Sequence, residues 1–131
     1  MSFRPEAIRG GDRGTGAVVD YRLTRQQVVT QFRKGRLSRL DVCDAHPELR
    51  RAAAGIGRPT GEGCPICEDC AVVLVTYAFG SGLPAGGRTV TTAREMAQLT
   101  RRRATVTCYV VEVCPDCGWN HLTRVFQAGN G

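Results

Sequence analysis

Runs of apolar residues divide the carboxy-terminal half of the chain into three candidate strands. Residues 71–79 (AVVLVTYAF) form an apolar run rich in β-branched side chains. In residues 104–113, apolar side chains recur at every second position, and a shorter run occupies residues 121–126. Such patterns are typical of β-strands. The pattern therefore predicts three strands in this half of the chain.

The amino-terminal half instead carries the signals of short helices. Thr24 and Gln27 have the spacing of a capping box, which satisfies free backbone N–H groups where a helix begins. Leu23 and Val28 flank the box as a hydrophobic staple, so a helix is expected to run to about Lys34.

Two more short helices are expected after this one. Ser38 and Asp41 form a second capping box. Pro47 is favoured at a first helical position, and a third helix is expected from there through Ala54. Three short helices in succession leave open a helix-turn-helix arrangement that reads DNA.

The remaining signals divide the chain into three parts. Residues 1–17 are glycine-rich and basic, which predicts a flexible tail, and residues 18–58 form the helical segment. Residues 57–63 (GRPTGEG) form a linker at the change of composition. Residues 59–131 carry the strands, interrupted by a helix expected over 92–103, with Thr92 and Glu95 as its capping box. The fold class predicted is α+β.

Four of the seven cysteines stand in two Cys-x-x-Cys turns, at Cys64 and Cys67 and at Cys114 and Cys117. This is the spacing of a tetrahedral metal site. A strand is expected after each turn and also before the second, an order that makes a ribbon of three antiparallel strands. Gly118 provides the left-handed backbone that such a turn needs, whereas the first turn has Glu68 at the equivalent position.

Residues 63–127, with their paired turns, resemble the zinc-ribbon superfamily with rubredoxin-like knuckles. The resemblance implies three antiparallel strands with both turns at one end. A narrower resemblance is to a small actinobacterial zinc-ribbon family of uncharacterised function. The stretches that carry it are VVDY, DVCDAHPELRRAA, CPIC and EVC-x-x-C-x-WNHL.

The donor set favours one structural Zn²⁺, although four thiolates also accept iron. Catalytic zinc sites keep a position open for water or substrate, and four cysteines close the coordination shell. No set of nucleophile, base and acid can be assembled from the remaining residues. The chain is therefore expected not to be an enzyme and to have no small-molecule substrate.

The sequence pattern around the remaining cysteines, His121 and Trp119 is less specific than that of the four paired cysteines. Cys70 is either an auxiliary thiol beside the metal or an idle surface cysteine. Cys43 and Cys108 are expected to be small core residues, and His121 to be an alternative ligand only if a cysteine is displaced. Trp119 is either a lid over the sulfurs or an exposed contact for a partner.

The net charge of +6 is concentrated in the first half of the chain. Residues 1–60 carry twelve basic and six acidic side chains, whereas residues 61–131 carry six of each. No apolar run is long enough to span a bilayer, and the amino terminus lacks the apolar centre of a secretory signal. A cytoplasmic location is expected, where thiols stay reduced.

The charge asymmetry favours a non-enzymatic adaptor that binds nucleic-acid machinery, such as RNA polymerase or the ribosome. The residues expected to contact nucleic acid or its protein partners are Arg22, Arg25, Arg33, Lys34, Arg36, Arg39, Arg50, Arg51 and Trp119. The alternatives are a rubredoxin-like electron carrier, a thiol or zinc redox sensor, and a DNA-binding regulator that uses the helical segment.

Overall fold

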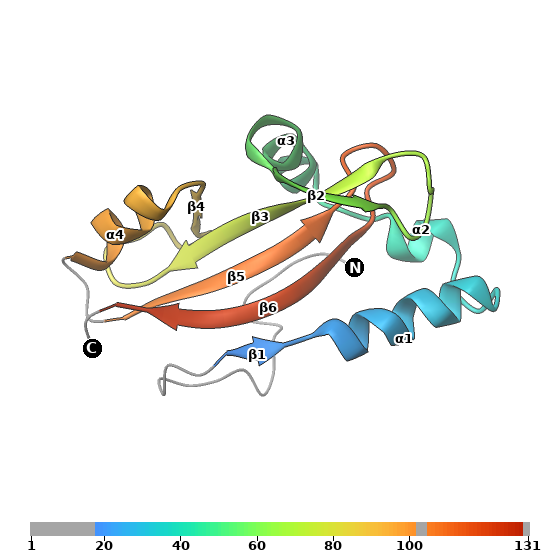
Figure 1. Cartoon of the computed structure of the whole chain (residues 1–131), viewed down its shortest axis with the longest axis horizontal. Coiled ribbons are helices and arrows are strands. Elements are labelled where there is room, and N and C mark those ends of the chain that lie inside the picture. The colour runs from blue at the N-terminus through green and yellow to red at the C-terminus, as the bar shows by residue number, and fades with distance from the viewer. Residues whose placement is uncertain (1–17, 102–104, 130–131) are drawn as a thin grey trace.

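A computed structural model describes residues 18–101 and 105–129 of the chain. These residues form one antiparallel sheet of six strands accompanied by four helices (Figure 1). The elements are β1 (Val19–Asp20), α1 (Arg22–Arg33), α2 (Arg39–Val42), α3 (Pro47–Ile56), β2 (Arg58–Gly63), β3 (Ala71–Phe79), β4 (Arg88–Val90), α4 (Ala93–Arg101), β5 (Val106–Val113) and β6 (Asn120–Ala128). Among them, no helix has the length and apolar character needed to cross a bilayer.

The strands lie in the order β1-β6-β5-β3-β2. β2 and β4 share the outer edge of β3: β2 pairs with its first half and β4 with its second half. The three expected strands are therefore β3, β5 and β6, the centre of the sheet. β5 pairs along most of its length with β3 on one side and β6 on the other, and all three strands coincide with the apolar runs of the sequence.

The predicted fold class, three short helices followed by a three-stranded ribbon, is wrong because β1, β2 and β4 extend the sheet to six strands. β2 lies in the stretch taken for a linker. Its proline and glycines carry no apolar periodicity, and it is held by pairing with the edge of β3, including Pro59 opposite Val73. β1 and β4 have two and three residues, which is too short for a periodic pattern. The predicted tail 1–17 lies outside the described residues.

The two faces of the sheet are covered by different helices. Leu49 and Ala53 of α3 pack on one face, against a cluster that includes Val75, Val111 and Val113. On the opposite face, Leu99 of α4 packs over Ala78, Val106 and Cys108 at the end of the sheet far from the cysteine turns. Cys108 is fully buried, as its place in the strand predicts.

α1 begins at Arg22, and the predicted capping box at Thr24 with its hydrophobic staple is wrong. Leu23 is 74% exposed, and the N-cap residue Tyr21 makes no side-chain capping bond. The reason lies in β1, which pairs with β6 as far as Asp20 and leads directly into the helix. The Asp20 carboxylate accepts a hydrogen bond from the Arg22 N–H at 2.8 Å and so supplies the cap.

The other helix starts follow the sequence more closely. Ser38 and Asp41 form the expected reciprocal capping box of α2, and Pro47 occupies the first turn of α3 behind His46 as N-cap. Before α4, the Thr92 hydroxyl accepts from the Glu95 N–H at 3.1 Å, but the Glu95 carboxylate bonds to Thr91 instead of Thr92. The end expected for this helix, residues 102–103, lies outside the described residues.

Gly57, the C-cap residue of α3, packs against Val73 of β3. A Cβ atom there would lie 2.4 Å from both the Ala53 carbonyl oxygen and a methyl group of Val73. Gly57→Ala should therefore lower the free energy of unfolding by about 1–3 kcal/mol in urea titrations. Gly55→Ala, inside the same helix with open space around it, should instead raise it by about 0.5–1 kcal/mol. Equal effects would contradict this packing.

Candidate metal centre

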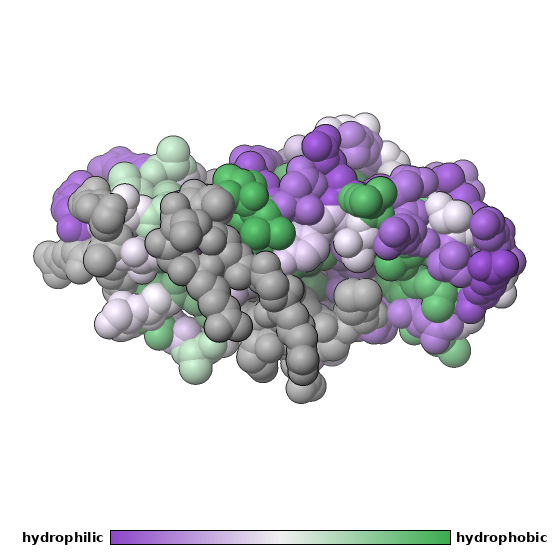
Figure 2. All heavy atoms as spheres, turned by 90° about the horizontal axis from the view of Figure 1, so that it is seen from below, coloured by the Kyte–Doolittle hydropathy of each residue, from purple (hydrophilic) through white to green (hydrophobic). Residues whose placement is uncertain are grey.

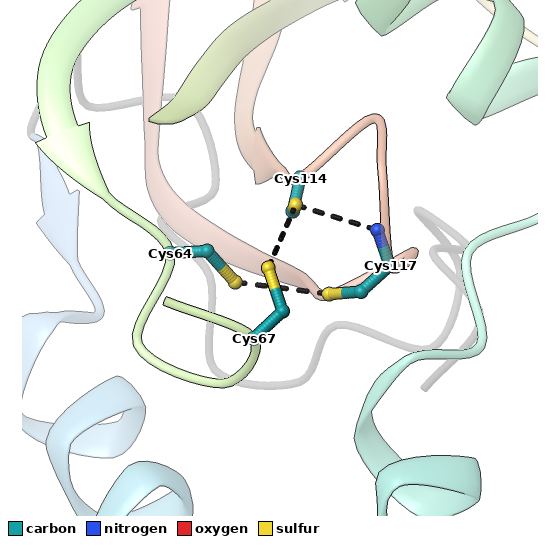
Figure 3. Close-up of side chains that lie close together, drawn as sticks. All are labelled: Cys64, Cys67, Cys114 and Cys117. Atoms are coloured by element: carbon teal, nitrogen blue, oxygen red, sulfur yellow. Dashed lines mark hydrogen bonds between the residues drawn. The ribbon is translucent and has the colours of Figure 1, made fainter. Parts of the chain in front are cut away.

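Two turns at one end of the sheet bring four sulfur atoms together. The first knuckle (residues 64–67) follows β2, and the second knuckle (residues 114–117) connects β5 to β6 (Figures 1 and 3). The Sγ atoms of Cys64, Cys67, Cys114 and Cys117 all lie within 4.8 Å of one another. The structure therefore brings together all four cysteines that the spacing identified.

The sulfur separations fit a tetrahedron of metal–thiolate bonds. Zn–S bonds of about 2.3 Å in tetrahedral geometry place the sulfurs about 3.8 Å apart. The Sγ atoms of Cys64 and Cys117 are 3.7 Å apart, and those of Cys67 and Cys114 are 3.8 Å apart (Figure 3). These two separations match the tetrahedron, and all four sulfurs lie close enough together to hold one metal ion.

The backbone repeats one hydrogen-bonding pattern in the two knuckles. The N–H of Cys64 donates to the Cys70 carbonyl at 2.8 Å, and that of Cys114 donates to the Trp119 carbonyl at 2.8 Å. Gly118 has φ +91°, and Glu68 has φ +60° at the equivalent place, the one non-glycine residue with positive φ among the described residues. The first knuckle thus adopts the same turn with a side chain that tolerates it less well.

Backbone N–H groups also point at the sulfurs. The N–H of Ile66 lies 3.4 Å from Cys64 Sγ, that of Cys117 lies 3.4 Å from Cys114 Sγ, and that of Trp119 lies 3.4 Å from Cys117 Sγ. Donors arranged in this way stabilise negative charge on sulfur. The turns are therefore built to hold thiolates.

Burial opposes that charge unless a cation is present. Cys64 and Cys114 are buried, and Cys67 and Cys117 are half-buried. Burial raises the pKa of the Cys64 thiol to about 11 and also raises that of Cys117, whereas at Cys67 the effect of burial is outweighed by hydrogen bonds, which lower the pKa. A metal ion would provide the positive charge that keeps these sulfurs deprotonated.

The segment between α2 and α3 holds the second knuckle from outside. The Ala45 N–H donates to the Gly118 carbonyl at 3.1 Å, and an Arg50 Nη2 donates to the Pro115 and Asp116 carbonyls at 3.3 and 2.5 Å. Hydrogen bonding to Cys43 raises the pKa of the Arg39 guanidinium, with a smaller contribution from Cys117. Arg39 and Arg50 thus place two positive charges beside the second knuckle.

A buried ion pair joins α1 to the sheet beside the knuckles. Arg25 donates from Nε and Nη2 to the two carboxylate oxygens of Glu112 at 2.8 and 2.9 Å. The Trp119 Nε1–H donates to the same carboxylate at 2.8 Å. With 5% of Glu112 and 1% of Trp119 exposed, the carboxylate and the indole of this polar network are buried, whereas the half-buried Arg25 reaches them from α1 and lines a surface pocket beside them.

His121 borders this network and is buried as well. Its ring stacks on that of Trp119 with the centroids 5.9 Å apart, and its Nδ1 lies 2.6 Å from the Leu122 carbonyl oxygen. Its Nε2 has no hydrogen-bond partner among the described residues. A cavity of about 120 Å³ lies beside it, lined by residues that include Val28, Asn120 and His121. His121 is outside the group of four mutually close sulfurs.

The residues expected to contact a partner fall into two groups. Arg25, Arg50 and Trp119 are engaged within the protein, and the burial of Trp119 agrees with the lid interpretation, not with an exposed contact. Arg22 is exposed and pairs with Asp20 at 2.9 Å. The other cations of the set are also exposed, and they are Arg33, Lys34, Arg36, Arg39 and Arg51.

Two important residues were not identified from sequence. Cys43, expected in the core, is half-buried with its Sγ 3.5 Å from that of Cys117, and nothing in its sequence context indicates this. Glu112 had a visible signal, a lone carboxylate between Val111 and Val113 in an apolar strand. Cys70, the expected auxiliary thiol, is half-buried with its Sγ 3.6 Å from the Ala71 carbonyl and is outside the group of four.

Residues 13–131 match the model of DUF5318, described as a family of unknown function. The chain belongs to this family. The uncharacterized protein Rv0049 of Mycobacterium tuberculosis is 39% identical over 111 residues, which are 85% of this chain and 81% of the relative. The uncharacterized protein Mb0050 of Mycobacterium bovis matches with the same identity and coverage.

No solved structure matches the chain. The expected membership of a family of uncharacterised function is thus confirmed through DUF5318 and its mycobacterial relatives, whereas none of these matches places the chain in the zinc-ribbon superfamily. The names of the DUF5318 relatives state no activity, cofactor or partner. What the protein does must therefore be argued from its own site.

Removing one partner of the buried ion pair leaves a charge without compensation. Arg25→Ala should lower the free energy of unfolding by about 3 kcal/mol, measured by urea denaturation followed by tryptophan fluorescence. Arg22→Ala removes the same charge from the same helix, but its ion pair is exposed, so the loss should stay below about 1 kcal/mol. Similar losses in both variants would contradict a structural role for the buried pair.

His121 should make the protein sensitive to mild acid. Burial lowers the pKa of His121 from its usual value of 6.5, so the unfolded chain takes up a proton at higher pH than the folded chain. The contribution of the neutral His121 ring to the free energy of unfolding is complete at pH values above 6.5. It is lost as the pH falls through the folded-state pKa, at up to about 1.4 kcal/mol per pH unit. His121→Leu should reduce the difference in unfolding free energy between pH 7 and 5. An unchanged pH difference in His121→Leu would contradict this role of His121.

Proposed function

We propose that the protein is a non-enzymatic zinc protein in which one structural Zn²⁺ joins the two knuckles, and whose basic end docks on nucleic-acid machinery such as RNA polymerase or the ribosome. The observation that carries the metal is the set of four sulfurs within 4.8 Å of one another, two pairs of which have the separation expected of a zinc tetrathiolate. Cys64, Cys67, Cys114 and Cys117 would hold the ion, which when bound supplies positive charge and a cross-link between β2 and the β5–β6 turn.

Four thiolates support a structural role over a catalytic one. They fill the tetrahedron and leave no position for water or substrate. Iron is accepted by the same donors, and with iron the site would be a one-electron centre. Colour separates the two metals, because a ferric tetrathiolate is red whereas the zinc form is colourless.

The basic end supports the docking part of the proposal. Arg33, Lys34, Arg36 and Arg39 are all exposed between the last turn of α1 and the first residue of α2. Hydrophilic residues cover the end of the molecule where α1 finishes (Figure 2). Cations gathered in this way attract phosphate or acidic protein surfaces.

The arrangement of the helices does not favour a DNA-reading helix-turn-helix. α1 reaches the face of the sheet that carries Glu112, whereas α3 packs over Val111 and Val113 on the opposite face. α2, between them, has four residues. The helices therefore do not pack as the adjacent pair that inserts into a major groove.

Metal analysis tests the first part of the proposal. The purified protein should contain one zinc per chain, and Cys114→Ser should lose the metal and at least about 3 kcal/mol of unfolding free energy. Cys108→Ser also changes a buried cysteine in β5, but it should retain zinc. A metal-free wild-type protein that unfolds at the same denaturant concentration with and without a chelator would refute the zinc centre.

Salt dependence tests the second part. Changing Arg33, Lys34 and Arg36 to Glu should abolish capture of polymerase or ribosomal components from a lysate. If the ligand is a nucleic acid, the same triple substitution should make affinity less dependent on salt. The slope of log affinity against log salt should fall by about 0.9 for each phosphate that the protein no longer neutralises. Arg94→Glu with Arg101→Glu, two exposed cations of α4 at the opposite end, is the matched control and should bind normally. Binding that does not change with salt would contradict this interface.

A further inference from the structure

A fifth sulfur lies against the metal centre without belonging to it. Cys43 Sγ is 3.5 Å from Cys117 Sγ, closer than the 3.7 and 3.8 Å that separate ligand sulfurs. Cys43 is nevertheless outside the group of four mutually close ligands. It therefore contacts the ligand Cys117 from outside the tetrahedron and donates its S–H to that sulfur.

The backbone around both residues maintains this contact. Cys43 is the C-cap of α2, and two residues later the Ala45 N–H donates to the Gly118 carbonyl. A Cβ atom at Gly118 would lie 3.1 Å from the Cys43 carbonyl oxygen, so glycine allows the two segments to approach. The two sulfurs are therefore held together by the fold, since main-chain contacts on both sides fix the segments that carry them.

We propose that Cys43 and Cys117 are a site of oxidative modification, at which hydrogen peroxide forms a disulfide and displaces the metal. The inference rests on the proposed zinc centre. Closing the bond requires the sulfurs to approach from 3.5 Å to about 2.05 Å. At the first of these distances the two sulfurs are already in van der Waals contact with one another.

The reaction balances with peroxide as the oxidant. Peroxide oxidises the Cys43 thiol to a sulfenic acid, its O–O bond breaks, and one water leaves. The Cys117 sulfur then attacks the Cys43 sulfur, the S–O bond breaks, and hydroxide takes up a proton to leave as the second water. The two sulfurs lose two electrons in total, peroxide gains them, and the metal loses one of its four ligands.

The other two non-ligand cysteines lie in different surroundings. Cys108 is fully buried in the far core, where its Sγ lies 3.8 Å from the Met96 sulfur. Cys70 directs its Sγ to the Ala71 carbonyl and also interacts with the ligand Cys114, so it is the competing thiol that the experiment must exclude. Both therefore serve as controls that remove a thiol and leave the Cys43–Cys117 pair intact.

The oxidised protein would keep one knuckle and release the other. The second knuckle would be bonded covalently to the end of α2, in addition to its contacts with Ala45 and Arg50. The first knuckle would lose the ion that ties it to the second. Peroxide would thus convert a metal link between the knuckles into a sulfur link between the second knuckle and the helices.

The experiment uses the zinc-loaded full chain treated with hydrogen peroxide. Zinc release is followed with a chromogenic chelator, and disulfides are mapped by differential alkylation and mass spectrometry. Wild type, Cys70→Ser and Cys108→Ser should all release zinc and give a Cys43–Cys117 disulfide. Cys43→Ser should release zinc about tenfold more slowly, because it lacks the thiol already beside Cys117. Dithiothreitol with added zinc should restore the original site.

The outcomes separate this inference from the proposed function. A protein that carries no zinc before oxidation refutes the zinc centre. A zinc-loaded protein overturns the inference alone if its disulfide joins two ligands or involves Cys70, or if Cys43→Ser releases zinc as fast as wild type. Zinc content and circular dichroism of Cys43→Ser before oxidation show that the variant is folded and loaded.

Discussion

The convergence of four sulfurs from two distant turns is the constraint on which this end of the molecule depends. Each knuckle is held by its own backbone hydrogen bonds, yet Cys64 and Cys114 are buried, and burial raises the pKa of Cys64 to about 11. A cation shared between the knuckles would stabilise the thiolate form of these buried sulfurs. The apolar cluster around the site, which includes Val29, Val42 and Trp119, is assembled from α1, α2 and both knuckles. Its packing therefore depends on the knuckles remaining together.

The Arg25–Glu112 pair is the second link between α1 and this end of the sheet. A buried carboxylate is costly unless every oxygen is satisfied. Here Arg25 contributes two hydrogen bonds and Trp119 a third. The pair therefore fixes the position of α1 over the strands and holds the indole over the knuckle from which it emerges. An arginine chosen from sequence as a surface contact serves, in the structure, as an internal one.

The features that were predictable from sequence are local ones. The three central strands follow from continuous apolar runs, the α2 cap from Ser38 and Asp41, and the metal site from the cysteine spacing. β2 was not predictable, because its residues pair through backbone groups and carry no periodic pattern. The start of α1 depends on the pairing of β1 with β6, two strands from opposite ends of the sequence. Cys43 was misassigned for the same reason, since its neighbour Cys117 is 74 residues away in sequence.

The edges of the sheet have a consequence for how the protein behaves at high concentration. One edge ends in β1, which has two residues, and the other is formed partly by β2, where Pro59 cannot donate a hydrogen bond and the register shifts before Gly63. A proline-containing and irregular edge offers a poor template for strands of another molecule, so the β2 edge is protected from edge-to-edge addition. Among the described residues, β1 covers only Arg124 and Val125 of the nine-residue β6, so the opposite edge offers more backbone groups to an incoming strand.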